Sequence, residues 1–168
     1  MTDSPSKHGL SHLDEQGAAR MVDVGDKPET ARFAAAEGFV RLAPVVLAAI
    51  RDNAIAKGPV LQTARLAGIL AAKRTDELIP LCHTLPLDRL DIHFTLTDSG
   101  VQMRAEAATT ARTGVEIETL VALSIAGTTI IDMTKSLDRT GCLESIRVVE
   151  KSGGRSGRWT HPSQRAQP

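Results

Sequence analysis

Two charged residues inside a long apolar stretch are the first candidates for chemistry in this sequence. Asp132 and Lys135 stand three positions apart, so on a helix they lie on the same side. Charges are costly in apolar surroundings unless they are paired or used. The two residues could form an ordinary helix ion pair worth about 0.3 kcal/mol. The apolar context favours instead a buried pair in which Asp132 tunes the lysine or acts as a base.

His83 is a second candidate, in a loop that two prolines bracket. Pro80 and Pro86 stand on either side of it, and Cys82 precedes it. A loop held in this way can present a histidine that donates a hydrogen bond to an anionic or purine-like ligand. The alternative is a loop histidine whose hydrogen bonds are satisfied within the protein. The sequence has no further ligands at the spacing of a metal site, so we expect no bound metal.

Cations beside glycines form a third set of candidates. Lys57 precedes Gly58, and taken alone it is a solvated cation at a helix end. The segment KSGGRSG at 151–157 begins with Lys151, and its glycines and cations could close over phosphates. It lacks the strand–GxxxxGK[ST]–helix pattern of a Walker loop, so a disordered basic tail is the alternative.

The longest predicted helix, within residues 113–138, positions several of these groups. Its apolar residues recur at helical spacing. Thr113 and Glu116 predict a capping box at its start, where Glu116 and Glu118 also suit the helix dipole. Glu118 and Asp132 are 14 residues apart, which is about 21 Å along the axis. Either the two ends serve different purposes, or a two-fold dimer pairs such helices and brings opposite ends together.

Shorter elements precede and follow this helix. Alternation and propensity predict strands at residues 20–24, 90–96, 101–107 and 144–150, and helices at 42–56 and 60–75. Residues 29–41 are ambiguous, because their alanines favour a helix whereas the alternation from Phe33 to Phe39 permits a strand. This order predicts an α+β fold, with helices stacked on one face of an antiparallel sheet.

Composition limits the classes of partner. A chain of 168 residues with 42% hydrophobic content is expected to form one domain. An aromatic content of 2% argues against binding nucleic acid by base stacking, and a net charge of zero indicates no polyanionic partner. No apolar run reaches the roughly 20 residues of a membrane span. The N-terminus lacks the apolar core of a signal peptide, and two distant cysteines indicate no disulfide framework. These features predict a cytoplasmic protein that binds neither nucleic acid nor membrane.

Six motifs together resemble the cyclic pyranopterin monophosphate synthases, the molybdenum cofactor biosynthesis protein C family. They are MVDV at 21–24, KG at 57–58, TARLAGILAAKRTDELIPLCH at 63–83, GVEIE at 114–118, IIDMTK at 130–135 and KSGGRSG at 151–157. The resemblance spans about residues 17–157. Any one motif would be weak, but six in the family's order make chance an inadequate explanation.

The resemblance implies a ferredoxin-like α+β subunit, with an antiparallel sheet and helices on one face. It implies a homo-oligomer, a hexamer assembled as a trimer of dimers, with the active site at the dimer interface. It also implies that residues 29–41 are a strand, and we follow the family there because tertiary context overrides propensity. We expect a flexible N-terminus at 1–16, one catalytic domain at 17–157 and a flexible basic tail at 158–168.

The implied reaction converts 3′,8-cyclo-7,8-dihydroguanosine 5′-triphosphate to cyclic pyranopterin monophosphate and diphosphate, in molybdenum cofactor biosynthesis. The substrate is a nucleotide-derived small molecule, and no cofactor is required. By resemblance, Asp132, Lys57 and Lys135 are catalytic. The positions that match the family's substrate-binding segments are Leu81, Cys82, His83, Glu116, Ile117, Glu118 and Lys151. The two glutamates would grip the guanine-like edge, whose N–H donors suit carboxylate acceptors.

Some positions depart from the family's usual residues. Thr84 stands where proline is usual and could loosen the His83 loop, and Gly127-Thr128 replaces Ala-Leu and could change dimer packing. Isoleucine replaces methionine at 117 and tyrosine at 131, and threonine replaces cysteine at 134. None of these changes removes a titratable catalytic group, so we expect activity to be retained.

Two other functions are compatible with the residues alone. A nucleotide-binding regulatory module would use the charged residues to hold a ligand without chemistry. A purely structural oligomer would use Asp132 and Lys135 as a buried stabilising pair, and their mutation would mainly lower the melting temperature.

Overall fold

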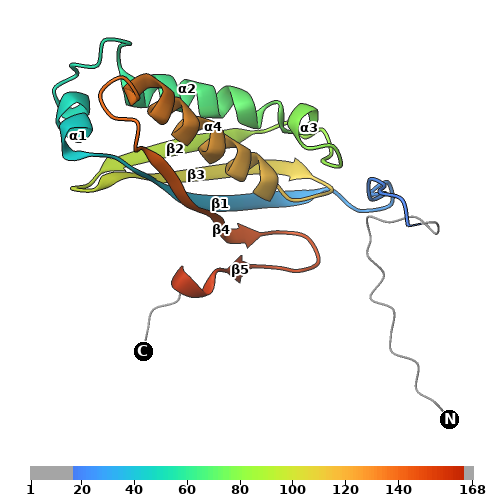
Figure 1. Ribbon diagram of the computed structural model, residues 1–168. Coiled ribbons are helices and arrows are strands. Elements are labelled where there is room, and N and C mark those ends of the chain that lie inside the picture. The colour runs from blue at the N-terminus through green and yellow to red at the C-terminus, as the bar shows by residue number, and fades with distance from the viewer. Residues whose placement is uncertain (1–16, 165–168) are drawn as a thin grey trace.

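The computed structural model describes residues 17–164, which form one sheet and a layer of helices (Figure 1). The expected flexible segment at 1–16 lies outside the described residues. The elements in chain order are β1 (Thr30–Arg41), α1 (Pro44–Arg51), α2 (Val60–Ala72), α3 (Thr75–Leu78), β2 (Arg89–Leu96), β3 (Gly100–Ala111), α4 (Glu116–Thr134), β4 (Cys142–Ser152), β5 (Trp159–Thr160) and a 3-10 turn at Pro162–Gln164.

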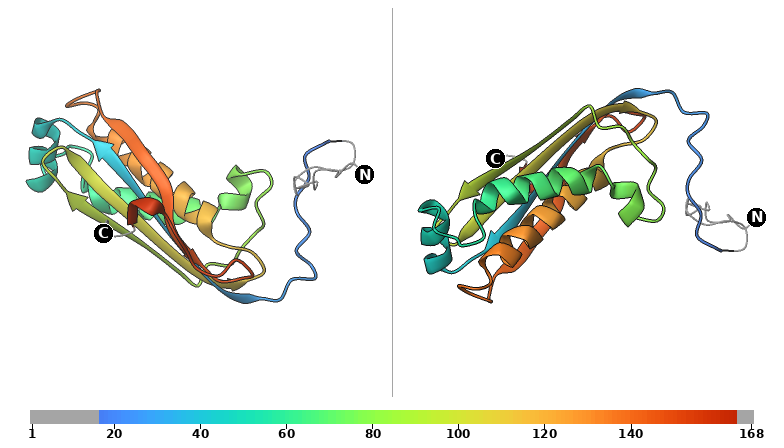
Figure 2. Two further views of the ribbon diagram at one scale, coloured as in Figure 1. Left: turned by 90° about the horizontal axis from the view of Figure 1, so that it is seen from below. Right: turned by 90° about the horizontal axis from the view of Figure 1, so that it is seen from above.

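The strands are all antiparallel and lie in the order β2-β3-β1-β4-β5. The first four strands and the helices between them follow the β-α-β-β-α-β order of ferredoxin-like folds. Helices α2 and α4 lie side by side across one face of the sheet, as the view from above makes plain (Figure 2). The predicted α+β architecture, with helices on one face of an antiparallel sheet, is confirmed.

Small side chains bring the helices close to the sheet. Ala36 of β1 and Ala105 of β3 are fully buried in the core, where they pack with Leu123 and Ile130 of α4. Within residues 17–164, α4 is the one helix long and apolar enough to cross a membrane, but 56% of that stretch is buried inside the protein. It is therefore the core helix of the fold.

Glycine permits the closest contact between the two long helices. A Cβ atom at Gly68 of α2 would lie 2.7 Å from the carbonyl oxygen of Ala122 in α4 and 2.6 Å from Ile92 Cδ1. We expect Gly68→Ala to lower the free energy of unfolding by about 2 kcal/mol, because the helices must separate to admit the methyl group. Urea unfolding measures this effect. Gln62→Ala, at an exposed position of the same helix, is the control and should change it by less than about 0.5 kcal/mol.

Several boundaries differ from the sequence prediction. Residues 29–41, which composition alone favoured as a helix, are strand β1 as the family resemblance implied. The strand lies between β3 and β4, and pairing with both neighbours outweighs the helix propensity of alanine. Residues 20–24 are not a strand. The helix predicted at 42–56 ends at Arg51, because Asn53 turns the chain with a φ of 55°.

The start of α4 differs from the sequence prediction, and the C-terminal segment contains a further strand. The predicted capping box is absent: α4 begins after Val115, and no side chain caps it. Within the expected tail at 158–168, the structure describes secondary structure at residues 159–164: β5 pairs with β4, and His161 N donates to Val149 O at 2.8 Å. Three glycines with positive φ, at 153, 154 and 157, allow this hairpin to turn. Residues 165–168 lie outside the described part of the chain.

Gly127 faces the sheet rather than the outside of the molecule. A Cβ there would lie 2.4 Å from Leu143 Cδ1 and 3.2 Å from Met103 Cε. The glycine therefore accommodates side chains of β4 and β3, whereas Thr128 beside it is exposed.

Candidate functional site

Three predicted catalytic residues meet at the carboxyl-terminal end of α4. Lys57, from the loop between α1 and α2, places its Nζ 2.8 Å from Asp132 Oδ2 and 2.9 Å from the Asp132 carbonyl oxygen. Lys135 Nζ lies 2.7 Å from the other carboxylate oxygen, Oδ1. Each oxygen of one carboxylate thus accepts a hydrogen bond from a different ammonium group. We call Lys57, Asp132 and Lys135 the lysine–aspartate cluster.

This cluster is exposed in the protomer, which corrects the expectation of a buried pair. The side chains of Lys57, Asp132 and Lys135 are 48%, 53% and 59% exposed, because Asp132 lies on the outer side of α4 while Met133 faces the core. Hydrogen bonds and charge from Lys135, and then from Lys57, lower the pKa of Asp132 to about 2. Exposed ion pairs contribute little to stability, so the cluster adds little to the stability of the protomer.

The remaining predicted residues lie around the amino-terminal end of α4. These residues, which we call the glutamate–histidine cluster, are Leu81, Cys82, His83, Glu116, Ile117, Glu118 and Lys151. Lys151 Nζ of β4 donates to Glu116 Oε1 at 2.8 Å. His83 Nε2 donates to the carbonyl oxygen of Val22 at 2.8 Å, since a carbonyl can only accept. The lysine and the histidine are thus each held by a defined partner.

Glu118 is the buried acid of this second cluster. Only 3% of the residue is exposed, and its Oε2 has no hydrogen-bond partner among the described residues. Burial first, and then the negative charges of Glu116 and Asp76, raise the pKa of Glu118 to about 7. Burial and the nearby Glu118 also raise the pKa of the Cys82 thiol. A carboxyl group that titrates near neutrality is suited to gain and lose a proton during a reaction.

Two residues that the sequence did not single out also lie here. Arg32 of β1 donates from Nε to Ala111 O at 3.2 Å and from Nη2 to Arg112 O at 3.1 Å. Its Nη1 would be 2.0 Å from a Cβ at Gly154, so it packs against the glycine loop that follows Lys151. Asp76 accepts a hydrogen bond from Thr84. The sequence pattern did not identify Arg32, because the secondary structure of residues 29–41 was ambiguous. It did not identify Asp76, because the contact between Asp76 and Thr84 depends on how the intervening loop folds.

Thr84, which departs from the family's usual proline, holds the His83 loop through a side-chain hydrogen bond. Its Oγ1 donates to Asp76 Oδ2 at 2.5 Å, which links the end of the loop to α3. The hydroxyl group thereby supplies a restraint where proline would have restricted the backbone.

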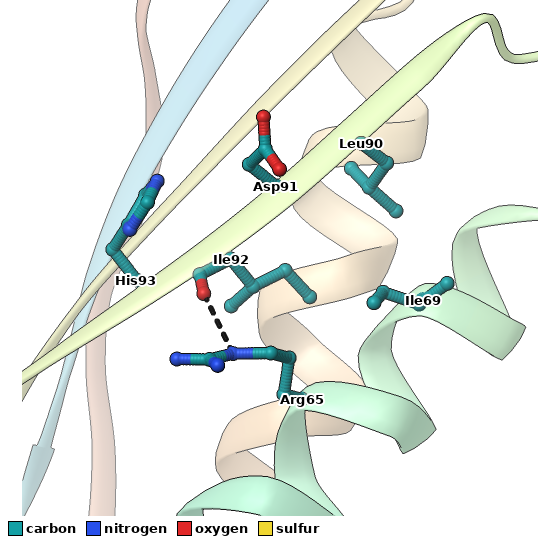
Figure 3. A pocket seen from close by; sticks show the side chains of 6 residues that line it. All are labelled: Arg65, Ile69, Leu90, Asp91, Ile92 and His93. Atoms are coloured by element: carbon teal, nitrogen blue, oxygen red, sulfur yellow. Dashed lines mark hydrogen bonds between the residues drawn. The ribbon is translucent and has the colours of Figure 1, made fainter.

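The protomer separates the two clusters. Glu118 and Asp132 lie at opposite ends of the same 19-residue helix, about 21 Å apart along its axis. A small open pocket of about 150 Å³ lies elsewhere, at the edge strand β2, and its lining contains none of the predicted site residues (Figure 3). Arg65 is one of its lining residues and donates from Nε to Ile92 O at 3.0 Å. One protomer therefore does not bring all the predicted site residues together.

Comparison with known proteins gives the family. A family model described as the MoaC family matches residues 21–154. The chain belongs to the MoaC family. The matched span contains every predicted site residue, from Lys57 to Lys151. Among residues 17–164 of this MoaC chain, no group of three or more His, Cys, Asp or Glu side chains is placed to hold a metal ion.

Three curated relatives carry the name cyclic pyranopterin monophosphate synthase. The protein of Thermomicrobium roseum is 51% identical over 152 residues, which cover 89% of this chain and 92% of the relative. That of Novosphingobium aromaticivorans is 52% identical over 150 residues, covering 89% and 96% of the two chains. That of Brucella ovis is 53% identical over 152 residues, covering 89% and 92%. The similarity therefore extends over nearly the whole length of these MoaC proteins.

Proposed function

We propose that this chain is a cyclic pyranopterin monophosphate synthase. It is a lyase of molybdenum cofactor biosynthesis that converts 3′,8-cyclo-7,8-dihydroguanosine 5′-triphosphate to cyclic pyranopterin monophosphate and diphosphate. The observation that carries the proposal is the lysine–aspartate cluster, in which two lysines from different elements converge on one exposed carboxylate. Such a group can exchange its carboxylate partner for phosphate oxygens and can take part in proton transfer.

The phosphate step gives the lysines a defined task. A ribose hydroxyl oxygen bonds to the phosphorus nearest the sugar, the bond from that phosphorus to the diphosphate oxygen breaks, and the hydroxyl proton passes to a base. Negative charge accumulates on the departing diphosphate. Lys57 and Lys135 would stabilise that charge as the triphosphate replaces Asp132 as their partner, with no redox cofactor required.

The two carboxylates are tuned for different roles. Asp132, with a pKa of about 2, is a weak base at neutral pH, so we assign it to holding and orienting the two lysines. Glu118, with a pKa of about 7, accepts and returns protons far more readily at that pH. Proton transfers to the rearranging base and sugar carbons would therefore involve Glu118 in addition to the catalytic lysines.

The glutamate–histidine cluster supplies the groups for binding. Glu116 and Glu118 would accept hydrogen bonds from the N–H donors of the guanine-derived ring. Lys151 and Arg32, next to the glycine loop, would add positive charge for the triphosphate. The remaining contacts in this assignment come from Leu81, Cys82, His83 and Ile117.

A two-fold dimer would join the two clusters into complete sites. An axis near Ile125, midway between Glu118 and Asp132, would set each glutamate end against the partner's aspartate end. The outer surface of the helix layer suits such a contact, because it exposes large apolar side chains. Those on α2 and α4 are Leu66 (63% exposed), Leu70 (59%), Ile117 (38%) and Ile125 (37%). Burying them against a second copy would remove apolar surface from water.

We further propose that three such dimers form a hexamer in the cytoplasm, as the family resemblance implies. Light scattering on the purified protein tests the hexamer. The activity itself is tested by supplying the cyclic dihydroguanosine triphosphate intermediate without reductant. Release of diphosphate together with the cyclic phosphate product supports the proposal, whereas saturable binding without products would favour the nucleotide-binding regulatory module.

Mixed subunits test the shared site directly. Lys57→Ala damages one cluster and His83→Ala the other, so a mixed dimer would keep one site in which both clusters are intact. Random pairing of the two inactive variants in equal amounts should restore about a quarter of the wild-type rate. The measurement is turnover after joint unfolding and refolding.

The matched control mixes Lys57→Ala with Asp132→Asn. Both changes fall in the same cluster, so every site in the mixed dimer stays damaged and no rate should return. Equal recovery in both mixtures, or none in either, would contradict a site made from the two clusters of different subunits.

A further inference from the structure

The loop that carries Leu81, Cys82 and His83 is closed at its base by a side-chain hydrogen bond. Thr84 Oγ1 donates to Asp76 Oδ2 at 2.5 Å, and Asp76 belongs to helix α3, directly before the loop. The bond closes a ring of chain from residue 76 to residue 84. Because both partners are side chains, substitutions can remove the bond without altering the backbone.

The same loop is held at two further points. The backbone N–H of Cys82 donates to Ile79 O at 3.0 Å, which forms a turn within the loop. His83 is tied on its other side to Val22 O. The Thr84 bond therefore completes a set of restraints around His83, and it fixes the distance between the loop and α3.

Asp76 also brings negative charge to the buried carboxyl group of Glu118. It contributes to the raised pKa of Glu118, after burial and Glu116, and to the raised pKa of Cys82. The titratable and charged groups around Glu118 are Glu116 of the same helix, with Lys151 of β4 as its ion-pair partner, Asp76 of α3, and Cys82 of the loop. Within this set, Asp76 is the charged residue whose side chain also accepts the hydrogen bond from Thr84 that closes the His83 loop.

We propose that Asp76 and Thr84 are positioning residues for the site: their hydrogen bond closes the loop that presents His83, and the Asp76 carboxylate keeps a negative charge beside Glu118. The kinetic consequences rest on the proposed function, but the structural consequences do not. The two residues have separable effects. Thr84→Val removes the hydroxyl donor and leaves the charge, whereas Asp76→Asn removes the charge and leaves an oxygen that can accept the hydrogen bond.

The kinetic test compares these variants in the full-length protein. Thr84→Val should raise KM about 5-fold through the lost hydrogen bond, with the pH–rate profile unmoved, and Thr84→Ser should behave as wild type. Asp76→Asn should leave KM nearly unchanged and move the Glu118 limb of the pH–rate profile down by about 0.5 pH unit. Thr84→Pro, which restrains the loop without a hydroxyl group, should have a KM close to that of wild type, below the raised KM of Thr84→Val.

Two measurements do not depend on turnover. Hydrogen exchange of the amides at 81–84 should be faster in Thr84→Val than in wild type and unchanged in Thr84→Ser. The Glu118 carboxyl carbon, followed by NMR, should titrate at lower pH in Asp76→Asn.

These results separate the positioning role from the proposed activity. If wild type fails to turn over the intermediate while both measurements give the expected result, the activity is wrong and the positioning role stands. Unchanged loop exchange in Thr84→Val would overturn the role of the hydrogen bond. An unchanged Glu118 titration in Asp76→Asn would overturn the role of the charge.

Discussion

Asp132→Asn should lower turnover of the cyclic dihydroguanosine triphosphate by about 10³-fold, because both catalytic lysines lose the carboxylate that holds and orients them. The pKa of Asp132 is about 2, so the wild-type carboxylate is ionised throughout the range in which the assay is run. Asparagine keeps one oxygen but removes the charge that holds Lys57 and Lys135 together. Lys57→Ala should cause a loss of similar size, because it removes one of the two ammonium groups.

The melting temperature separates a catalytic from a structural role for Asp132. Its ion pairs are exposed, so their loss should leave thermal unfolding nearly unchanged. Asp98→Asn in the β2–β3 turn and Lys73→Ala after α2 are matched controls at exposed positions, and both should keep wild-type rates. If Asp132→Asn retained its rate but melted at a much lower temperature, the structural oligomer would be the better account.

Glu118→Gln should lower turnover by about 100-fold and, at alkaline pH, stabilise the protein. The pKa of Glu118 is about 7 in the folded protein, against 4.5 for an unperturbed glutamate. Between these values the folded state holds the proton more tightly than the unfolded chain, so stability falls as pH rises from 4.5 to 7. Because glutamine carries no charge, the stability of the variant should not fall over this pH range through the ionisation of residue 118.

The predicted difference therefore depends on pH. Above pH 7, Glu118→Gln should be more stable than wild type by about 2 kcal/mol, after allowance for solvent screening. Below pH 4.5, where the wild-type carboxyl group is neutral in both states, the difference should vanish or reverse. Urea unfolding at pH 3.5 and pH 8.5 measures it, with Glu77→Gln at an exposed position as control. A pH-independent difference would mean that burial of the Glu118 charge does not cause it.

The buried carboxyl group of Glu118 costs stability, and the proposed proton transfer is the function that it would serve. Only 3% of Glu118 is exposed, and one of its oxygens has no hydrogen-bond partner among residues 17–164. Buried polar atoms of that kind are costly and need an explanation. Its place beside Lys151, Cys82 and the His83 loop supplies one, because a ligand bound there could satisfy the free oxygen.

The sequence by itself determined the fold class and the protein family, and it supplied the residues now proposed for the site. Alternation predicted the β2–β3 hairpin, and helical spacing predicted α4, because each pattern depends on which side of an element faces the core. Six motifs in order indicated the family, which the family model confirms over residues 21–154. The spacing of Glu118 and Asp132 indicated that the two acids lie too far apart for one pocket, since the rise per residue of a helix is fixed.

Only the tertiary structure decided what these residues contact. Lys57 is 75 positions from Asp132 in sequence, yet they share a hydrogen bond, and no local pattern encodes such a pairing. Strand β1 has alanines that favour a helix, but pairing with β3 and β4 on both sides makes it a strand. Burial likewise depends on everything that surrounds a side chain. For that reason Asp132 proved exposed although its neighbours are apolar, and Glu118, in the first turn of α4, proved to be the buried acid.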